Sequence, residues 1–347
     1  TIFSRPIKWY GLLFALGFLL GQQLLLWMLK KELPREKKYQ KRAEKDIETL
    51  TIYLVLATII GARLGHVLFY EPDKYLQNPM DIIKIWEGGL ASHGAAIALL
   101  FSLWLFTRKK SHWTWLQITD RIVIVVALVG TLIRLGNFMN SEIYGLPTNS
   151  NYGVVFARNA SEALISNSSP IAEADYEKNG KIIGEIVPIT MKLTFKNGAD
   201  EDRKQSYIEN SIPALLGGRY SYISEHVFIE TRKPVEYELN GRQASVAVLG
   251  IPRHPTQLYE SFTTFLIFIL LFLIWYKYRE NLPHGRLLGL FLMILFGMRF
   301  VHEFFKENQV AFEDNIPLNM GQLLSIPMVI AGILILIKSF RNQGTGS

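Results

Sequence analysis

Seven stretches of about 20 mostly apolar residues most constrain the fold of this chain, because a helix of that length crosses the hydrocarbon core of a bilayer. They predict an all-α polytopic membrane protein with seven transmembrane helices. The first run continues into a basic stop without a small-residue cleavage site, so we expect no cleavable signal peptide. The predicted spans are 10–29, 52–70, 89–107, 121–139, 258–276, 287–305 and 321–338.

The lysines and arginines predict the orientation of these spans. Residues 30–45 hold eight basic residues against three acidic ones, and the connections 107–119 and 277–286 are basic as well. The connections 71–87 and 306–320 are instead rich in Asp and Glu. Because short basic loops stay in the cytoplasm, we expect the N-terminus outside and the C-terminus in the cytoplasm.

The long segment 140–252 has the composition of a soluble domain, with eleven basic and fourteen acidic residues. Alternating apolar and polar runs at 186–195 and 220–230 predict β-strands. We therefore expect a β-containing extracytoplasmic domain inserted between the fourth and fifth spans. The predicted division is 1–139 for transmembrane helices 1–4, 140–252 for the inserted periplasmic domain, 253–341 for helices 5–7, and 342–347 for a tail typical of a cloning remnant.

The net charge of +7 and the absence of cysteine exclude several classes of function. Nucleic-acid binding would gather the positive charge on one folded face, whereas here it alternates between loops, so we expect no nucleic-acid partner. A chain without cysteine has no thiol chemistry, thiolate zinc site or iron–sulfur cluster of its own. The histidines are scattered and no carboxylate pair has ligand spacing, so we expect no metal and no cofactor.

Four charged residues fall within or at the ends of apolar spans, where a charge costs at least about 2.5–3.5 kcal/mol and marks a functional candidate. They are Arg63, Arg134, Arg299 and Glu303. For Arg299 and Glu303 the alternative is a structural ion pair, because residues four apart share a helix face. For Arg63 the alternative is a side chain that snorkels to the outer interface.

The richest polar stretch, residues 134–145, ends the fourth span at its outer face. Arg134 and Asn137 share a helix face, and Asn140 and Glu142 follow. A guanidinium beside two carboxamides and a carboxylate suits a polar head group, because Arg donates two parallel hydrogen bonds to a phosphate. A helix C-terminus capped by polar residues would explain the asparagines, but not an arginine one turn deeper.

Residues 252–260 form a second polar motif, which enters the fifth span from the same side. The motif includes Arg253, Tyr259 and Glu260. Solvated loop charges and an interfacial tyrosine are the alternatives to a functional site here.

A third candidate, His93, precedes Gly94 at the outer start of the third span. A histidine titrates near neutral pH and can accept a proton, although a histidine hydrogen-bonded in a helix cap is the alternative. Tyr10 lies at the outer start of the first span, where an aromatic-belt residue is the default interpretation.

Five motifs follow one another along nearly the whole chain. They are Trp-Tyr-Gly (9–11), Gly-Gly-x-x-x-His-Gly (88–94), Arg-Leu-Gly-Asn-Phe-x-Asn-x-Glu-x-x-Gly (134–145), Pro-Arg-His-Pro-Thr-Gln-Leu-Tyr-Glu (252–260) and Met-Gly-Gln-x-Leu-Ser-Ile-Pro (320–327). In this order they resemble the prolipoprotein diacylglyceryl transferase family. The chain departs from the family's pattern at Ala95, where a third glycine is usual, and in the length of its insertion.

The resemblance implies a transferase of the bacterial cytoplasmic (inner) membrane that needs no cofactor. The sn-1,2-diacylglyceryl group of phosphatidylglycerol would pass to the lipobox cysteine thiol of a preprolipoprotein, forming a thioether and releasing glycerol phosphate. A thiol with a pKa of about 8.5 needs a base, and a departing phosphate needs its charge stabilised. The implied partners are phosphatidylglycerol, preprolipoprotein lipobox segments and membrane lipids.

The resemblance also implies roles for single residues. Arg134 and Arg253 would stabilise the departing phosphate. His93 is the candidate base, with Tyr10 or a carboxylate as alternatives. The residues implied to bind substrate are Tyr10, Asn137, Asn140, Glu142, Gly145, Gln257, Tyr259 and Glu260. The residues implied to support the site are Arg63, Gly94, Arg299 and Glu303.

Two other classes of function are compatible with intramembrane arginines. One is a non-enzymatic transporter of anionic lipids, because such arginines also line transport pathways. The other is a membrane receptor that binds its ligand through the extracytoplasmic domain. Formation of a thioether from phosphatidylglycerol and a lipobox peptide distinguishes the transferase from both.

Overall fold

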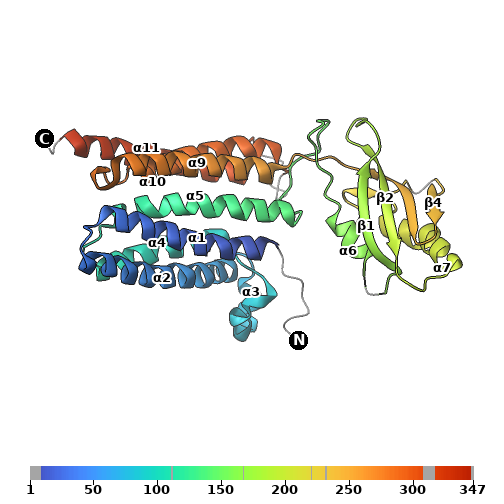
Figure 1. The fold of residues 1–347 in the computed structure, drawn as a ribbon, viewed down its shortest axis with the longest axis horizontal. Helices are drawn as coiled ribbons and strands as arrows, with labels where there is room; N and C mark the ends of the chain where they lie inside the picture. Colours follow the sequence, from blue (N-terminus) through green and yellow to red (C-terminus); the bar gives the residue numbers. More distant parts are fainter. Residues whose placement is uncertain are drawn as a thin grey trace. The chain divides into compact units, whose positions relative to one another are not determined.

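The computed structural model describes residues 9–110, 112–166, 168–219, 221–230, 233–307 and 317–344 (Figure 1). The chain divides into two compact units. The first unit is drawn from segments 1–13, 133–261 and 301–320, and the second from 14–132, 262–300 and 321–347. Of the predicted tail 342–347, residues up to Gly344 are helical, and residues 345–347 lie outside the described residues.

Long apolar helices dominate the described chain. Six are long and apolar enough to cross a membrane, which confirms a mostly helical, multi-pass architecture. A further helix, α4 (Ser92–Lys109), corresponds to the predicted span 89–107 and is not among these six. The six helices are α1 (Trp9–Glu32), α2 (Lys37–Phe69), α5 (Trp115–Met139), α9 (Thr256–Tyr278), α10 (Arg286–His302, extended by a 3₁₀ turn to Phe305) and α11 (Met320–Gly344).

Helix α2 is much longer than the predicted span 52–70, because it begins at Lys37 inside the basic segment. Its polar first half is anchored by Asp46, which is 1% exposed. The Asp46 carboxylate lies 3.0 Å from the Lys110 ammonium, 2.6 Å from His112 Nε2 and 3.2 Å from Trp113 Nε1. The connection between α1 and α2 is therefore short, and most of its basic residues are helical.

Glycines let the helices of the second unit approach closely. A Cβ built on Gly94 would lie 2.3 Å from the Gly61 carbonyl oxygen and 2.7 Å from the Gly65 Cα, so α4 packs directly against the α2 backbone. The same holds for α10 and α11, where a Cβ on Gly289 would lie 2.9 Å from the Gly332 carbonyl oxygen. Small residues at such contacts are the usual means of helix association in membranes.

The inserted segment contains an antiparallel sheet with strand order β1-β2-β5-β3, and β4 also pairs with β5. The strands are β1 (Ile171–Lys178), β2 (Val187–Phe195), β3 (Val227–Phe228), β4 (Tyr237–Asn240) and β5 (Gln243–Gly250). The hairpin between β4 and β5 turns at Gly241, whose φ of 61° favours glycine. The prediction of a β-containing insertion is therefore confirmed.

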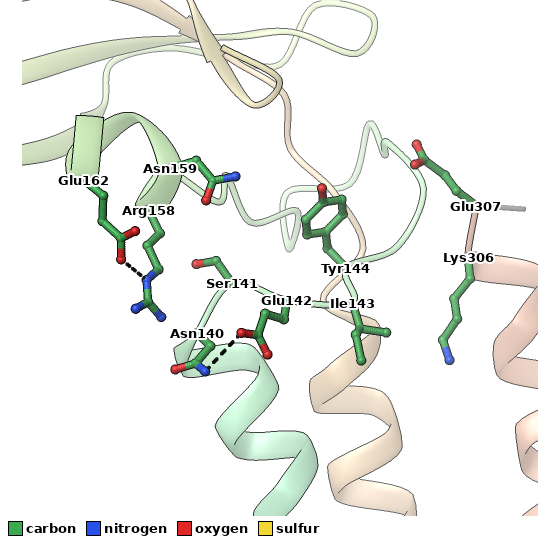
Figure 2. Close-up of a pocket in the computed structure, with 10 residues that line it drawn as sticks. All are labelled: Asn140, Ser141, Glu142, Ile143, Tyr144, Arg158, Asn159, Glu162, Lys306 and Glu307. Atoms are coloured by element: carbon green, nitrogen blue, oxygen red, sulfur yellow. Dashed lines mark hydrogen bonds and ion pairs between the residues drawn. The ribbon is translucent and has the colours of Figure 1, made fainter. Parts of the chain in front are cut away.

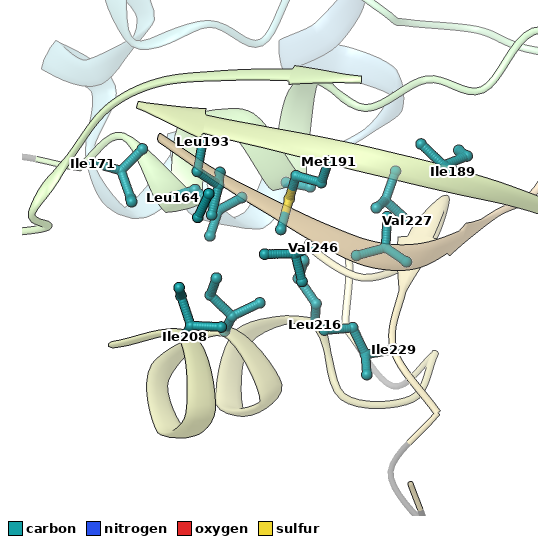
Figure 3. Packing of buried hydrophobic residues seen from close by; sticks show 14 of the residues in the cluster. Leu164, Ile171, Ile189, Met191, Leu193, Ile208, Leu216, Val227, Ile229 and Val246 are labelled. Carbon is teal, nitrogen blue, oxygen red and sulfur yellow. The ribbon is translucent and has the colours of Figure 1, made fainter. Parts of the chain in front are cut away.

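The core of this sheet domain lies between the sheet and short helices (Figure 3). Met191 and Val246 of the sheet pack opposite Ile208 and Leu216 of the segment formed by α7 (Glu201–Ser206), a π-helical turn (Tyr207–Ser211) and α8 (Ile212–Leu216). The strand predicted at 186–195 corresponds to β2. The strand predicted at 220–230 is wrong over most of its length, because residues 221–226 form turns and only β3 is extended.

Candidate functional site

The end of α5 and the loop after it form a tight polar turn in the first unit. Asn137 Nδ2 donates to Glu142 Oε2 (3.4 Å), and Asn140 Nδ2 donates to Glu142 Oε1 (3.2 Å). The Glu142 amide donates to the Asn137 carbonyl oxygen at 2.9 Å. Ser141 and Ile143, on either side of Glu142, have left-handed φ values of 56° and 58°. Such values are rare for non-glycine residues, so this carboxylate is held by a strained backbone.

Arg134 belongs to a buried network of charges in the same unit. Its Nε lies 2.7 Å from Glu260 Oε2, and the Arg134 side chain is 25% exposed. Glu260 also accepts a hydrogen bond from the ammonium of Lys306, which lies 3.2 Å from Glu303 Oε1. Glu260, Glu303 and Lys306 are all buried. Two cations and two carboxylates therefore balance one another, and the Arg134 side chain remains partly accessible.

Arg253 lies just before α9 and is only 3% exposed. One of its terminal nitrogens donates to the Gly145 carbonyl oxygen (3.1 Å) and lies 2.6 Å from Glu307. Its Nε donates to His226 Nδ1 at 3.1 Å, and its guanidinium lies over the Tyr144 ring at 4.9 Å. The predicted motifs 134–145 and 252–260 therefore meet at this arginine.

The groups around Arg253 have strongly shifted acidities. Burial and the neighbouring Arg253 charge lower the pKa of His226 to about 4, so its imidazole is neutral and can accept from the guanidinium. Burial, together with a 2.9 Å hydrogen bond to Glu225, raises the pKa of Tyr144 to about 12. His226 and Tyr144 pack edge to face with ring centroids 4.3 Å apart. A neutral aromatic wall therefore fixes the orientation of Arg253.

Hydrogen bonds to backbone carbonyl oxygens join the two motifs further. Gln257 Nε2 donates to the Glu142 carbonyl oxygen (2.7 Å), and Thr256 Oγ1 donates to the Ile143 carbonyl oxygen (3.2 Å). The Gly145 amide donates to the His254 carbonyl oxygen at 2.9 Å. A Cβ on Gly145 would lie 2.5 Å from the Phe305 carbonyl oxygen, so only glycine fits where these segments meet.

Three buried carboxamide oxygens of this region accept no hydrogen bond from the residues that the structure describes. They are Asn137 Oδ1, Asn140 Oδ1 and Gln257 Oε1. An unsatisfied buried polar atom costs about 1–3 kcal/mol, so each of these oxygens would be stabilised by a donor that reaches it. A hydroxyl group of a ligand would satisfy them.

A cavity of about 480 Å³ opens beside the turn, as Figure 2 shows. Asn140, Ser141 and Glu142 form one wall. Arg158 and Glu162 of α6 (Arg158–Leu164) face them and pair with each other at 2.7 Å. The remaining lining residues are Ile143, Tyr144, Asn159, Lys306 and Glu307. Two of the predicted site residues, Asn140 and Glu142, therefore border this cavity.

Two predicted tyrosines also lie in the first unit. Tyr10, near the start of α1, packs against the end of α5, because a Cβ on Gly136 would lie 2.9 Å from the Tyr10 Cα. The Tyr259 hydroxyl lies 3.2 Å from His254 Nδ1. Glu303 follows the end of α10 at His302, so the regular helix stops between Arg299 and Glu303.

Four predicted site residues belong to the second unit. Arg63 is 4% exposed and donates to the carbonyl oxygens of Asp81 (2.5 Å), Ile82 (2.8 Å), Gly88 (2.6 Å) and Gly89 (3.2 Å), so it holds the connection before α4. His93 is exposed at the start of α4, and its ring meets Phe69 and Tyr70 with centroids 5.1 and 5.8 Å away. Gly94 provides the contact with α2, and Arg299 lies near the end of α10.

The structure adds residues that the sequence motifs did not indicate. Lys306 is a buried partner of Glu260, and His226 with Glu225 and Glu307 surrounds Arg253. These residues stand in loops and in a strand-like run, where they resemble ordinary surface groups. Lys306 alone had a signal in the sequence, because it is an isolated lysine in the otherwise acidic connection 306–320.

The helices and the buried arginines together define a polytopic membrane protein with a polar site built on the ends of its helices. The model of the prolipoprotein diacylglyceryl transferase family matches residues 1–338. A phosphatidylglycerol–prolipoprotein diacylglyceryl transferase of Tolumonas auensis is 34% identical over 97% of this chain and 93% of its own length. Enzymes of the same name from Chloroherpeton thalassium and Porphyromonas gingivalis are 33% and 32% identical, over 97% and 99% of this chain and 89% and 93% of their own lengths.

The chain therefore belongs to the prolipoprotein diacylglyceryl transferase family. This confirms the resemblance drawn from the five motifs. The chain is a transferase and a multi-pass protein of the bacterial inner membrane.

Proposed function

We propose that the chain transfers the sn-1,2-diacylglyceryl group of phosphatidylglycerol to the lipobox cysteine of preprolipoproteins. The thiol sulfur attacks the glyceryl carbon that carries the phosphate, and a carbon–sulfur bond replaces the carbon–oxygen bond. The electron pair leaves with glycerol phosphate, and the thiol proton passes to a base. The names of the relatives, which state both substrates, support this reaction.

The observation that carries the proposal is the combination of a partly accessible arginine with buried, unsatisfied amide oxygens. Arg134 offers its remaining N–H groups to the phosphate, while Glu260 holds its Nε. Asn137, Asn140 and Gln257 offer acceptors to the hydroxyl groups of the glycerol head group. Hydrogen-bond donors suited to an anion therefore lie beside acceptors suited to hydroxyl groups. These two sets match the phosphate and the glycerol of the phosphatidylglycerol head group.

Arg253 lies where the motifs 134–145 and 252–260 meet, and it stabilises the negative charge of the departing phosphate. Its guanidinium is fixed by Gly145, Glu307 and His226, so it needs little reorganisation when charge develops. Glu142 orients the two asparagines, and Tyr10, Tyr259 and Glu260 contact or position the substrate. His93 is the proposed base, with Arg63 and Gly94 fixing the backbone around it.

We also propose that α4 crosses the membrane as a seventh span. It joins two connections that the charge pattern assigns to opposite sides, acidic before it and basic after it. The N-terminus then lies outside, the C-terminus in the cytoplasm, and the sheet domain, proposed as residues 140–252, in the periplasm. Residues 1–139 and 253–341 supply the two groups of helices.

The test is a transfer assay with purified protein, labelled phosphatidylglycerol and a lipobox peptide. Arg134→Ala is expected to lower thioether formation by roughly 10²–10³-fold, the usual cost of losing a charge stabiliser. Arg134→Lys is expected to recover little of it, because an ammonium lacks the planar fork of a guanidinium. The matched control is Arg203→Ala in the exposed part of α7, which is expected to behave like the parent.

Equal activity of Arg134→Ala and Arg203→Ala would contradict the role of Arg134. A parent protein that moves labelled lipid between vesicles without forming a thioether would contradict the transferase itself.

A further inference from the structure

The second unit contains a separate, strongly basic cavity at the other end of α1. This cavity has a volume of about 710 Å³ and lies where α1 ends, α2 begins and α9 ends. Its charged lining consists of Lys30, Lys31, Arg35, Arg279 and a single carboxylate, Glu32. None of its lining residues lines the cavity beside the turn at the end of α5, so the two cavities share no residue.

The carboxylate in this cavity is already engaged. Glu32 Oε1 lies 3.0 Å from Arg121 Nε and accepts a hydrogen bond from the Trp275 indole, and its side chain is 5% exposed. Lys30 is paired with Glu44 at 2.5 Å. The charges of Glu32 and Lys30 are therefore each compensated by a partner outside the lining.

Three cations of the lining have no ion-pair partner among the residues that the structure describes. Lys31 lies 5.9 Å from the centre of the Trp27 ring, and Arg279 lies 5.0 Å from that of Tyr276. Arg35 is exposed in the connection between α1 and α2. The cavity therefore carries an uncompensated positive charge that an anion would neutralise.

Hydrogen bonds hold the connection that forms one side of the cavity. Gln40 Nε2 donates to the carbonyl oxygens of Lys30 (3.1 Å) and Pro34 (3.0 Å), which closes the connection between α1 and α2. Arg279 adopts a left-handed φ of 45°, a conformation that non-glycine residues rarely take. This backbone conformation turns the chain at the end of α9, where Arg279 contributes to the lining.

One wall of the cavity is suited to the membrane. Trp27 is 39% exposed and stacks on Phe272 with ring centroids 6.0 Å apart. Leu273 and Tyr276 on α9 are also exposed. An indole next to cations at the end of a membrane helix is typical of the level of lipid head groups, where apolar and charged surfaces adjoin.

We propose that this cavity binds the phosphate-bearing head group of an anionic phospholipid, whose acyl chains lie along the exposed apolar residues of α1 and α9. Basic pockets between membrane helices are known to take such head groups. The site does not depend on the proposed function, since none of its residues belongs to the candidate active site. The free phosphate of a soluble metabolite shares the same chemistry, and the experiment separates the two.

The test uses the full-length protein in nanodiscs with a photoreactive phosphatidylglycerol that carries the reactive group on its head group. Chymotryptic peptides are mapped by mass spectrometry, so cross-links to residues 27–35 are counted separately from those at the active site. Each basic residue near an anionic lipid contributes about fivefold to binding. The triple variant Lys31→Gln, Arg35→Gln, Arg279→Gln is therefore expected to lower these cross-links at least tenfold.

The matched control removes three exposed cations that do not line the cavity, in the variant Lys37→Gln, Lys38→Gln, Lys41→Gln. Its cross-links are expected to equal those of the parent, and Arg35→Gln alone is expected to lower them several-fold if the triple variant folds poorly. Unchanged cross-links in the triple variant and in Arg35→Gln, or equal cross-linking by a phosphatidylcholine probe, would overturn the proposal. Loss of the cross-links on adding millimolar glycerol 3-phosphate would overturn the lipid assignment in favour of a soluble phosphate.

Discussion

At the scale of single residues, Glu260 is the carboxylate shared by Arg134 and Lys306. Glu260→Gln removes the charge that both cations face, so we expect it to lower the free energy of unfolding by roughly 3 kcal/mol. The control is Glu162→Gln, whose side chain is 63% exposed and pairs with Arg158. That exposed pair is expected to contribute less than about 1 kcal/mol.

Chemical denaturation of the detergent-solubilised protein measures both variants. Equal losses for Glu260→Gln and Glu162→Gln would show that the buried network contributes no more than a surface pair. Adding Lys306→Met to Glu260→Gln is expected to recover part of the loss, because it removes the excess cation and leaves one cation and one carboxylate in the network.

The shifted pKa of His226 predicts a dependence of stability on pH. An ordinary histidine has a pKa of 6.5, and that of His226 is about 4 in the folded protein. Between these values the unfolded chain binds the proton and the folded chain does not, so stability falls as the pH falls. We expect the His226 contribution at pH 5 to be about 2 kcal/mol lower than at pH 7.

The variant His226→Phe keeps an aromatic ring against Tyr144 but cannot titrate. The free energies of unfolding of variant and parent are measured at pH 7 and pH 5. Between these pH values, that of the variant is expected to fall by about 2 kcal/mol less than that of the parent. Parallel pH profiles of parent and variant would refute this prediction.

The sequence indicated arginines and amides as candidates for the site because such groups are costly in apolar runs. It could not reveal their partners. Lys306 reaches Glu260 across 46 residues, and His226 reaches Arg253 across 27. Neither spacing follows from helical or strand periodicity, since the tertiary fold alone brings these pairs together.

At the scale of elements, the contact between α2 and α4 depends on glycine. A Cβ on Gly94 would lie 2.3 Å from the Gly61 carbonyl oxygen, a distance that forces the helices apart. We expect Gly94→Ala to destabilise the protein by about 1–3 kcal/mol. The matched control is Gly297→Ala in α10, where a Cβ meets nothing within 4 Å and a higher helix propensity is expected to leave stability unchanged or raised.

Thermal unfolding of the two variants compares them directly. A melting temperature of Gly94→Ala at or above that of Gly297→Ala would contradict close packing of α2 on α4.

Hydropathy located the long helices well, because uninterrupted apolar length is a strong signal. It failed at their polar extensions, as in the first half of α2, where burial of Asp46 against Lys110 and His112 continues the helix. Alternation of apolar residues predicted β2 but overstated β3, since residues 221–226 alternate in sequence while forming turns.

At the scale of the whole molecule, the sidedness of α4 decides between six and seven spans. The chain has no cysteine, so single introduced cysteines report accessibility without background. We expect Leu76→Cys, before α4, to react with a membrane-impermeant maleimide in intact cells. Lys109→Cys, at the end of α4, is expected to react only after permeabilisation.

Ser168→Cys in the sheet domain and Lys38→Cys near the start of α2 serve as outside and inside references. Labelling of Leu76→Cys and Lys109→Cys from the same side would refute the seventh span.

The pairing of Arg134 with Glu260 has a consequence for how the protein is made. Arg134 reaches the membrane with α5, whereas Glu260 arrives with α9, after the whole sheet domain has been synthesised. At about 5–20 residues per second, the nascent chain spends roughly 10 s with this arginine in the membrane and its partner still missing. A ribosome that stalls within the sheet domain would therefore leave a half-inserted protein with an uncompensated charge, a state that quality-control proteases could recognise.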